Sequence, residues 1–203
     1  MPSKSRPVYR PAADFNSRDI LLTEIESGEW FRLHPGNFDP IRFSKNDESR
    51  FSPSGGPCGA LYLGADPETC ILEKFGDIIY GYRQRGEQVV LADAVWRSRE
   101  LTQLVLPGIK VCDLTDGTTL QQCGVDASAL MLPDLAVPQA WGVALMNHPN
   151  NFDGILYLSR FTQARCLAIF DRAPRIEQPR RLGLLAHHEG GAQVLKSFEI
   201  ALV

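Results

Sequence analysis

The chain has 203 residues, of which 44% are hydrophobic and 22% are charged, a composition typical of a compact globular domain rather than a disordered chain. The chain has 21 Lys and Arg and 24 Asp and Glu, which gives a net charge of -3. The protein as a whole therefore has no positive field that would attract nucleic acid or anionic lipid. No apolar run approaches the roughly 20 residues that span a bilayer, and residues 1–11 lack the apolar core of a signal peptide. We therefore expect a cytoplasmic protein without a membrane partner.

The basic residues are mostly arginine, with 16 Arg and five Lys. Because a guanidinium holds phosphate or carboxylate with a planar, often bidentate fork, this excess fits a phosphate-bearing small ligand, although a bias in base composition would give the same excess. The five cysteines are odd in number and form no CxxC pair, so neither a disulfide framework nor a structural zinc site is indicated. We expect no metal.

The first third of the chain contains an arm, two short elements and a long loop. Residues 1–16 are rich in Pro, Ser and Arg and form an N-terminal arm, which leaves residues 17–203 as the folded domain. The apolar spacing over residues 20–25 predicts a short amphipathic helix, and residues 30–34 alternate like a strand. Residues 35–59 carry four Pro and four Gly, which predicts a long loop of a kind that is often functional.

The remaining pattern predicts an α+β domain. Asp66-Pro67-Glu68 combines an N-cap, a proline at the first helical position and an acidic first turn, so a helix should run over 67–80. No internal repeat and no second domain are evident, and we expect a single compact domain with a mixed β-sheet core. The other predicted elements are strands over 88–96, 109–114, 154–158, 166–170 and 194–203, helices over 118–123 and 136–147, and a connector over 172–181.

Four short blocks contain polar residues at positions where the pattern alone would not place them. They are Phe31-Arg32, Arg50-Phe51, Leu61-Tyr62-Leu63 followed by Glu73, and Leu156-Tyr157-Leu158-Ser159-Arg160. In this order and spacing the blocks resemble the RES domain, a family named for its Arg, Glu and Ser, over roughly residues 28–172. One departure is that Glu48-Ser49 stands where the family usually has a glycine pair.

The resemblance implies a fold like that of ADP-ribosyltransferase toxins and an enzyme that consumes NAD. Family members are typically toxins of bacterial toxin-antitoxin pairs, neutralised by a helix-turn-helix antitoxin. Such an antitoxin would make the DNA contacts, so we expect no direct contact of this chain with nucleic acid. Whether the chain forms a homo-oligomer stays open. Some members degrade NAD and some transfer ADP-ribose to a protein. Water, phosphate and protein therefore all stay open as acceptors.

The resemblance also assigns roles to residues. Cleavage of the nicotinamide-ribose bond builds oxocarbenium character, and we expect the Glu73 carboxylate to stabilise it and to hold a ribose hydroxyl. Arg32 and Arg50 are expected to clamp the pyrophosphate, and Tyr62 to stack on the nicotinamide. Ser159 is expected to donate to a ribose hydroxyl or phosphate oxygen. No Rossmann fingerprint is present, so NAD is expected as a substrate rather than as a cofactor.

Each of these residues also has a purely structural interpretation. A helical glutamate is usually a solvated surface residue, and a tyrosine between leucines is usually a core aromatic. Arg32 would then extend from its strand to solvent or pair with Glu29 at the surface, and Ser159 would end its strand by bonding to the backbone. Arg42-Phe43 repeats the Arg-Phe dipeptide eight residues before Arg50, but the distance to Tyr62 favours Arg50.

Two further functions come from other classes. The first is a catalytically weakened RES-like module that binds NAD or a protein. The second is nucleic-acid binding through Arg172, Arg175, Arg180 and Arg181, which the net charge and the interrupting prolines disfavour. His187-His188-Glu189 suggests a metal site, but adjacent side chains diverge and no HExxH pattern exists, so surface histidines are the better interpretation.

Overall fold

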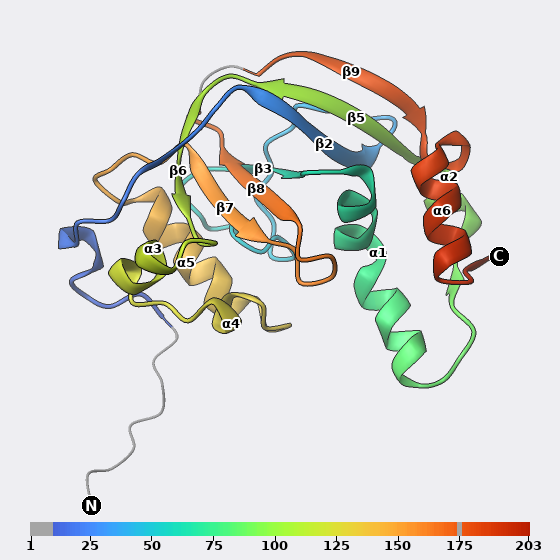
Figure 1. Ribbon diagram of the computed structural model, residues 1–203, viewed down its shortest axis with the longest axis horizontal. Helices are drawn as coiled ribbons and strands as arrows, with labels where there is room; N and C mark the ends of the chain where they lie inside the picture. The colour runs from blue at the N-terminus through green and yellow to red at the C-terminus, as the bar shows by residue number, and fades with distance from the viewer. Residues whose placement is uncertain (1–9, 174–175) are drawn as a thin grey trace, which may run out of the picture.

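A computed structural model describes residues 10–173 and 176–203, and the remaining residues of the predicted arm and Arg175 lie outside them. The chain forms a mixed eight-stranded sheet with helices packed against it, which confirms the predicted α+β class (Figure 1). The strand order is β1-β6-β7-β8-β3-β2-β5-β9, in which β6 and β7 are parallel and the other neighbours antiparallel. A separate parallel pair joins β4 to β10.

The strands are β1 (Thr23–Ile25), β2 (Gly28–Pro35), β3 (Ala60–Gly64), β4 (Val90–Leu91), β5 (Arg99–Leu106), β6 (Ile109–Asp113), β7 (Gly154–Leu158), β8 (Arg165–Phe170), β9 (Glu177–Leu184) and β10 (Ala201–Leu202). The helices are α1 (Pro67–Gln84), α2 (Asp93–Arg97), α3 (Gly117–Cys123), α4 (Ala127–Leu130), α5 (Ala136–Met146) and α6 (Glu189–Ser197), with 3-10 turns at Phe15–Ser17 and Leu185–His187. No helix in the described residues is long and apolar enough to cross a membrane.

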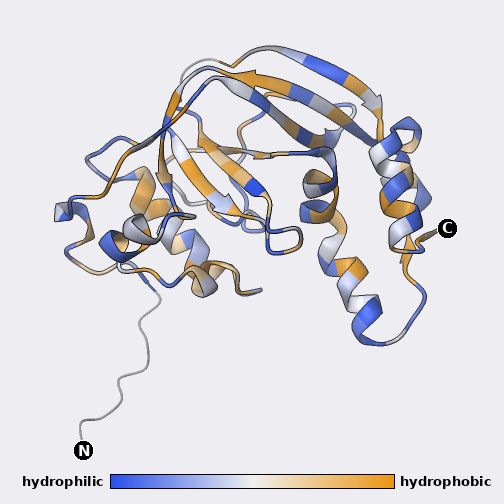
Figure 2. Cartoon of the chain, viewed as in Figure 1, coloured by the Kyte–Doolittle hydropathy of each residue, from blue (hydrophilic) through white to orange (hydrophobic). Residues whose placement is uncertain are grey.

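The central strands bury both of their faces. On one face, α5 contributes Trp141 to a cluster with β7 and β8, while α1 and α6 pack together over β2 and β5. On the other face, leucines and isoleucines of β3, β6, β7 and β8 form a second cluster. β7 and β8 accordingly show mostly apolar colours, whereas α1 and α6 alternate between polar and apolar bands (Figure 2). The strand prediction over 154–158 is confirmed because a strand buried on both sides reads as a continuous apolar run.

Helix α1 follows its sequence signals closely. The Asp66 side chain accepts a 2.7 Å hydrogen bond from the Thr69 backbone N–H, and Pro67 occupies the first turn. The helix begins where the sequence predicts and continues to Gln84, one turn beyond the predicted end. Its buried face, with Ile71, Phe75 and Ile79, fixes which side chains point away from the core.

Several predicted elements are wrong. Residues 23–25 form β1 rather than a helix, because they pair with β6, and Leu21 is half exposed. Residues 88–96 divide into the short strand β4 and helix α2. The predicted connector over 172–181 contains most of edge strand β9. The predicted last strand over 194–203 begins with the end of helix α6, at 194–197, and contains only the two-residue strand β10. Strand β5 and helix α4 were not predicted at all.

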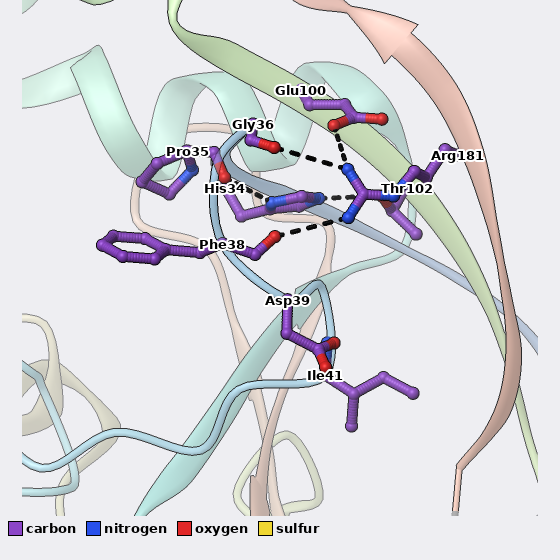
Figure 3. A network of polar contacts seen from close by, with 9 residues as sticks. All are labelled: His34, Pro35, Gly36, Phe38, Asp39, Ile41, Glu100, Thr102 and Arg181. Carbon is purple, nitrogen blue, oxygen red and sulfur yellow. Dashed lines mark hydrogen bonds and ion pairs between the residues drawn. The ribbon is translucent and has the colours of Figure 1, made fainter.

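Residues 36–59 form the predicted long loop, with one isolated bridge between Ser44 and Ala60. Its first part is held on the face of the sheet that carries His34, where Arg181 on β9 forms an ion pair with Glu100 (Figure 3). The Arg181 guanidinium also lies 3.5 Å from the carbonyl oxygens of Gly36 and Phe38. Strand β9 thereby fixes the start of the 36–59 loop.

Candidate active site

An open cavity of about 410 Å³ lies between helix α1, the middle of the 36–59 loop and the chain that follows α4. Its volume is in the range of small-molecule sites, about 300–1,000 Å³. The floor is made by the sheet, through Tyr62 on β3 and Tyr157 on β7. The charged residues that line this cavity are Glu48, Arg50, Glu73, Lys74, Asp77 and Arg160.

Glu73 and Ser159 are joined directly. The Ser159 hydroxyl donates a 2.7 Å hydrogen bond to Glu73 Oε1, and Ser159 is fully buried. Its Oγ also accepts from the backbone N–H groups of Phe161 at 3.2 Å and Thr162 at 3.3 Å. Since a hydroxyl has one proton to donate, Ser159 uses that proton on Glu73. Ser159 therefore positions the carboxylate, and donation to a ribose hydroxyl or a phosphate oxygen would require this bond to break.

The environment of Glu73 raises its pKa above that of an ordinary glutamate. Burial of the carboxyl is the largest cause, and the hydrogen bond from Ser159 and the charges of Arg50 and Arg160 oppose it. The negative charge of Asp77 adds a smaller upward shift. A buried carboxylate with fixed hydrogen-bond geometry is suited to stabilise positive charge that develops during a reaction.

Tyr62 connects the floor of the cavity to the loop above it. Its hydroxyl accepts a 2.9 Å hydrogen bond from the Phe51 backbone N–H and lies 3.0 Å from Ser52 Oγ. Burial raises the pKa of Tyr62, so the phenol stays neutral. Tyr157, to which the sequence analysis gave no role, lies nearby, and its ring contacts that of Phe51 edge to face at 5.1 Å. Two tyrosines thus line the cavity, and Tyr157 is the more deeply buried of the two.

Arg50 lies on the loop side of the cavity. Its Nη1 donates to the carbonyl oxygen of Leu130, at 2.6 Å, and lies 3.4 Å from that of Leu132. These carbonyls belong to the end of α4 and the following turn. They fix the guanidinium where its charge lowers the pKa of Glu73.

Helix α5 holds the backbone on both sides of Arg50. The Gln139 side-chain amide donates to the carbonyl oxygens of Asp47, at 2.9 Å, and Ser49, at 3.0 Å. One turn later, a Cβ at Gly142 would lie 2.0 Å from the Phe51 carbonyl oxygen, so only glycine allows this approach. Sequence analysis missed both residues, because neither carries a motif and the loop they contact is distant in sequence.

Comparison with known proteins gives the family and a similar fold. The RES domain model matches residues 29–188. The chain belongs to the RES domain family. The crystal structure of the M. tuberculosis MbcT-MbcA toxin-antitoxin complex contains a chain with a similar fold, with a TM-score of 0.58 and 18% sequence identity over 78% of this chain and 86% of that chain. No curated protein matches the chain.

In this RES domain, Arg32 lies apart from the cavity. Neighbouring residues of a strand point to opposite faces, and Leu33, not Arg32, lines the cavity. The Arg32 guanidinium donates to the carbonyl oxygens of Pro40, at 2.5 Å, and Arg42, at 3.2 Å. Burial lowers its pKa to about 10. The structure thus does not bring Arg32 together with Arg50, Tyr62 and Glu73, and it places Arg32 as an anchor of the 36–59 loop.

His34, two residues further along β2, shares the face of Arg32. Its Nε2 lies 2.8 Å from Thr102 Oγ1 and its Nδ1 lies 2.8 Å from the Pro35 carbonyl oxygen (Figure 3). Burial lowers the pKa of His34 and favours the neutral ring. Arg42, the alternative loop arginine, stacks on Phe38 at 4.5 Å and does not line the cavity.

Arg160 is an arginine of the RES cavity to which the sequence analysis gave no role. It follows Ser159 directly, forms an ion pair with Asp77 of α1 and lies over the Phe161 ring at 4.6 Å. Its charge, like that of Arg50, lowers the pKa of Glu73. The sequence signal was present in the block that ends Leu158-Ser159-Arg160.

The arginines considered for nucleic-acid binding are partly engaged within the chain. Arg172 donates to the carbonyl oxygens of Phe152 and Met146, and Arg181 pairs with Glu100. The His188 ring caps helix α6 by accepting a 3.1 Å hydrogen bond from the Gly190 N–H. Within the described residues, no three His, Cys, Asp or Glu side chains form a group that could hold a metal.

Proposed function

We propose that this RES domain consumes NAD by cleaving the nicotinamide-ribose bond, and that it acts as the toxin of a toxin-antitoxin pair. The observation that carries the proposal is the Glu73 carboxylate, held by Ser159 in the wall of a cavity that also presents Tyr62 and Arg50. Family membership supports NAD as the substrate. The cavity supplies the residue types that this bond cleavage requires, an anion for the sugar, a ring for the base and a cation for the diphosphate.

In the proposed reaction, the bond between ribose C1 and the nicotinamide nitrogen breaks, and its electron pair leaves with the nicotinamide. The positive charge that develops on the ribose is stabilised by the ionised Glu73 carboxylate, as in glycoside cleavage. An oxygen or other nucleophile of the acceptor then bonds to C1 and releases its proton. Water would give ADP-ribose, phosphate would give its 1-phosphate, and a protein side chain would become ADP-ribosylated.

Mass spectrometry of purified protein incubated with NAD tests this function and identifies the acceptor. We expect nicotinamide release with wild-type protein and a loss of about 10²- to 10³-fold in rate for Glu73→Gln, as for removal of other groups that stabilise transition-state charge. Glu68→Gln is the matched control, because Glu68 is an exposed glutamate of the same helix that does not line the cavity. Parallel samples with and without phosphate separate hydrolysis from phosphorolysis.

Two outcomes would contradict the proposed reaction. If NAD binds but stays intact, the chain is a binding module. If Glu73→Gln cleaves NAD at the wild-type rate, Glu73 does not stabilise the transition state.

The proposed partner is an antitoxin of the helix-turn-helix class that covers the cavity. The solved structure with the similar fold is a toxin-antitoxin complex, which supports a partner of this kind. We expect the partner to cover the 36–59 loop and the end of β7, since both border Glu73. Expression of this chain alone should arrest bacterial growth and lower cellular NAD, and co-expression of the adjacent gene should reverse both. Growth without arrest, despite abundant folded protein, would count against the toxin role.

A further inference from the structure

We propose that Arg160 contacts the ligand in this cavity and binds the diphosphate of the dinucleotide together with Arg50. This inference rests on the proposed function. It transfers to Arg160 the role that the sequence pattern gave to Arg32, whose guanidinium is bound to two backbone carbonyls on the opposite face of β2.

The position of Arg160 is fixed from three sides. Its backbone follows Ser159, whose hydroxyl is bonded to Glu73. Its guanidinium pairs with Asp77, which lies four residues after Glu73 and therefore on the same face of α1. The Phe161 ring supports the guanidinium at 4.6 Å. These contacts hold a positive charge beside the reactive carboxylate without the entropy cost of ordering a free side chain.

The hydrogen-bonding capacity of Arg160 is largely unused. A guanidinium has five N–H donors, and within the described residues Asp77 is the one side chain or backbone group that accepts from this one. Its Nε is buried and has no hydrogen-bond partner in that part of the chain. The remaining Nη N–H groups have no acceptor in the described residues and can donate to a ligand in the cavity that Arg160 lines.

The cavity wall carries three cationic side chains, Arg50, Lys74 and Arg160, and three carboxylates, Glu48, Glu73 and Asp77, and the two arginines are the groups suited to a diphosphate. Arg50 and Arg160 both line the cavity, and the charge of each acts on Glu73, so the two cations lie on the same side of the molecule. The diphosphate of a dinucleotide carries two negative charges, and guanidinium groups bind phosphate oxygens with short, charge-assisted hydrogen bonds. Asp77 orients Arg160 by accepting from one Nη, which leaves the rest of the fork for phosphate.

Calorimetric titration of the full chain with ADP-ribose and, separately, with nicotinamide tests this assignment. ADP-ribose contains the diphosphate and cannot be cleaved at the nicotinamide bond. We expect Arg160→Met to weaken ADP-ribose binding by about 10- to 100-fold, the effect of losing a charged hydrogen bond. Nicotinamide affinity should not change. Arg97→Met is the matched control, because Arg97 pairs with an aspartate in the same way but does not line the cavity.

The variant Arg160→Lys keeps the charge but not the fork, and we expect an intermediate loss of ADP-ribose affinity. If circular dichroism shows that Arg160→Met does not fold, the ADP-ribose affinity of Arg160→Lys tests the role of Arg160 instead. Wild-type affinity for ADP-ribose in a folded Arg160 variant would overturn the assignment while leaving the proposed function intact. An equal loss for nicotinamide would also overturn it, because the diphosphate would not be what Arg160 recognises. If wild-type protein releases nicotinamide from NAD but binds no ADP-ribose, this assignment fails and the proposed function stands; if it does neither, both fail.

Discussion

The Ser159 hydroxyl and the Glu73 carboxylate, 86 residues apart in sequence, form a 2.7 Å hydrogen bond that ties the end of β7 to helix α1. The bond gives each residue a different role. Glu73 faces the cavity, whereas Ser159 is fully buried and acts through Glu73. The Glu73 carboxylate is therefore presented to the cavity in a fixed orientation, as electrostatic stabilisation of a transition state requires.

Removal of the Ser159 hydroxyl should change the pH dependence of the reaction. The hydrogen bond from Ser159 lowers the pKa of Glu73 against the larger effect of burial. In Ser159→Ala that pKa should rise, so the acidic limb of kcat/KM should move to higher pH, because the ionised carboxylate is the active form. A pH-rate profile measures this shift.

Thr162→Val is the control for Ser159→Ala. It removes a hydroxyl of the same turn that bonds to Thr69 and not to Glu73. We expect the acidic limb to stay in place in this variant. An unmoved limb in Ser159→Ala, or the same shift in both variants, would show that Ser159 does not act on Glu73.

Glu73 should reduce the stability of the fold at neutral pH. Because burial raises its pKa in the folded state, stability is greatest below the unfolded pKa, about 4.3 for glutamate, and falls as the pH rises through the folded value. Glu73→Gln should thus unfold at a higher temperature than wild type at pH 7. The difference should disappear near pH 4. Thermal melts at both pH values, with Glu68→Gln as the exposed control, measure it, and a lower midpoint for Glu73→Gln at pH 7 would disprove the argument.

Gly142 should not tolerate a side chain. A Cβ there would meet the Phe51 backbone at 2.0 Å, and overpacking of this kind costs about 1–3 kcal/mol or more. We expect Gly142→Ala to lower the free energy of unfolding by at least about that much and to raise KM, since the displaced loop carries Arg50. Gly117→Ala is the control, because nothing lies within 4 Å of a Cβ at that helix start. Urea unfolding that gives both variants the same stability would refute the close approach of α5 and the loop.

Arg32 should contribute to stability rather than to ligand binding. Arg32→Met leaves the carbonyl oxygens of Pro40 and Arg42 without their donor, which should cost about 1–3 kcal/mol. That loss corresponds to a decrease of about 2–4 °C in unfolding midpoint per kcal/mol for a chain of this size. ADP-ribose affinity, measured by calorimetry on the folded variant, should stay close to wild type. A large loss of affinity with unchanged stability would return Arg32 to the binding site.

The elements that the sequence predicted correctly are those with local causes. Helix α1 has its cap, proline and acidic turn within three residues, and β7 is a continuous apolar run. Strand β9 and helix α6 depend on distant partners instead. The charged residues of β9 lie at the edge of the sheet, where polar side chains meet solvent, and α6 is capped by a histidine, which is an unusual N-cap.

The same distinction holds for the candidate site. Arg50, Tyr62 and Glu73 came from a resemblance of several blocks, and the structure brings all three to one cavity. Arg32 came from the same blocks, but the sequence does not tell which face of β2 borders the cavity. Because side chains alternate along a strand, Leu33 lies on the cavity face and Arg32 on the opposite one. Gln139 could not be predicted, because its contacts are with a loop 90 residues earlier in the chain.

A crystal structure of Glu73→Gln with NAD tests the central claim most directly. The variant should bind NAD without cleaving it. We expect intact dinucleotide in the cavity, with the nicotinamide ribose beside position 73, the nicotinamide against the Tyr62 ring and the diphosphate between Arg50 and Arg160. NAD bound elsewhere on the molecule, or an empty cavity at a saturating NAD concentration, would contradict the claim that this cavity is where NAD is cleaved.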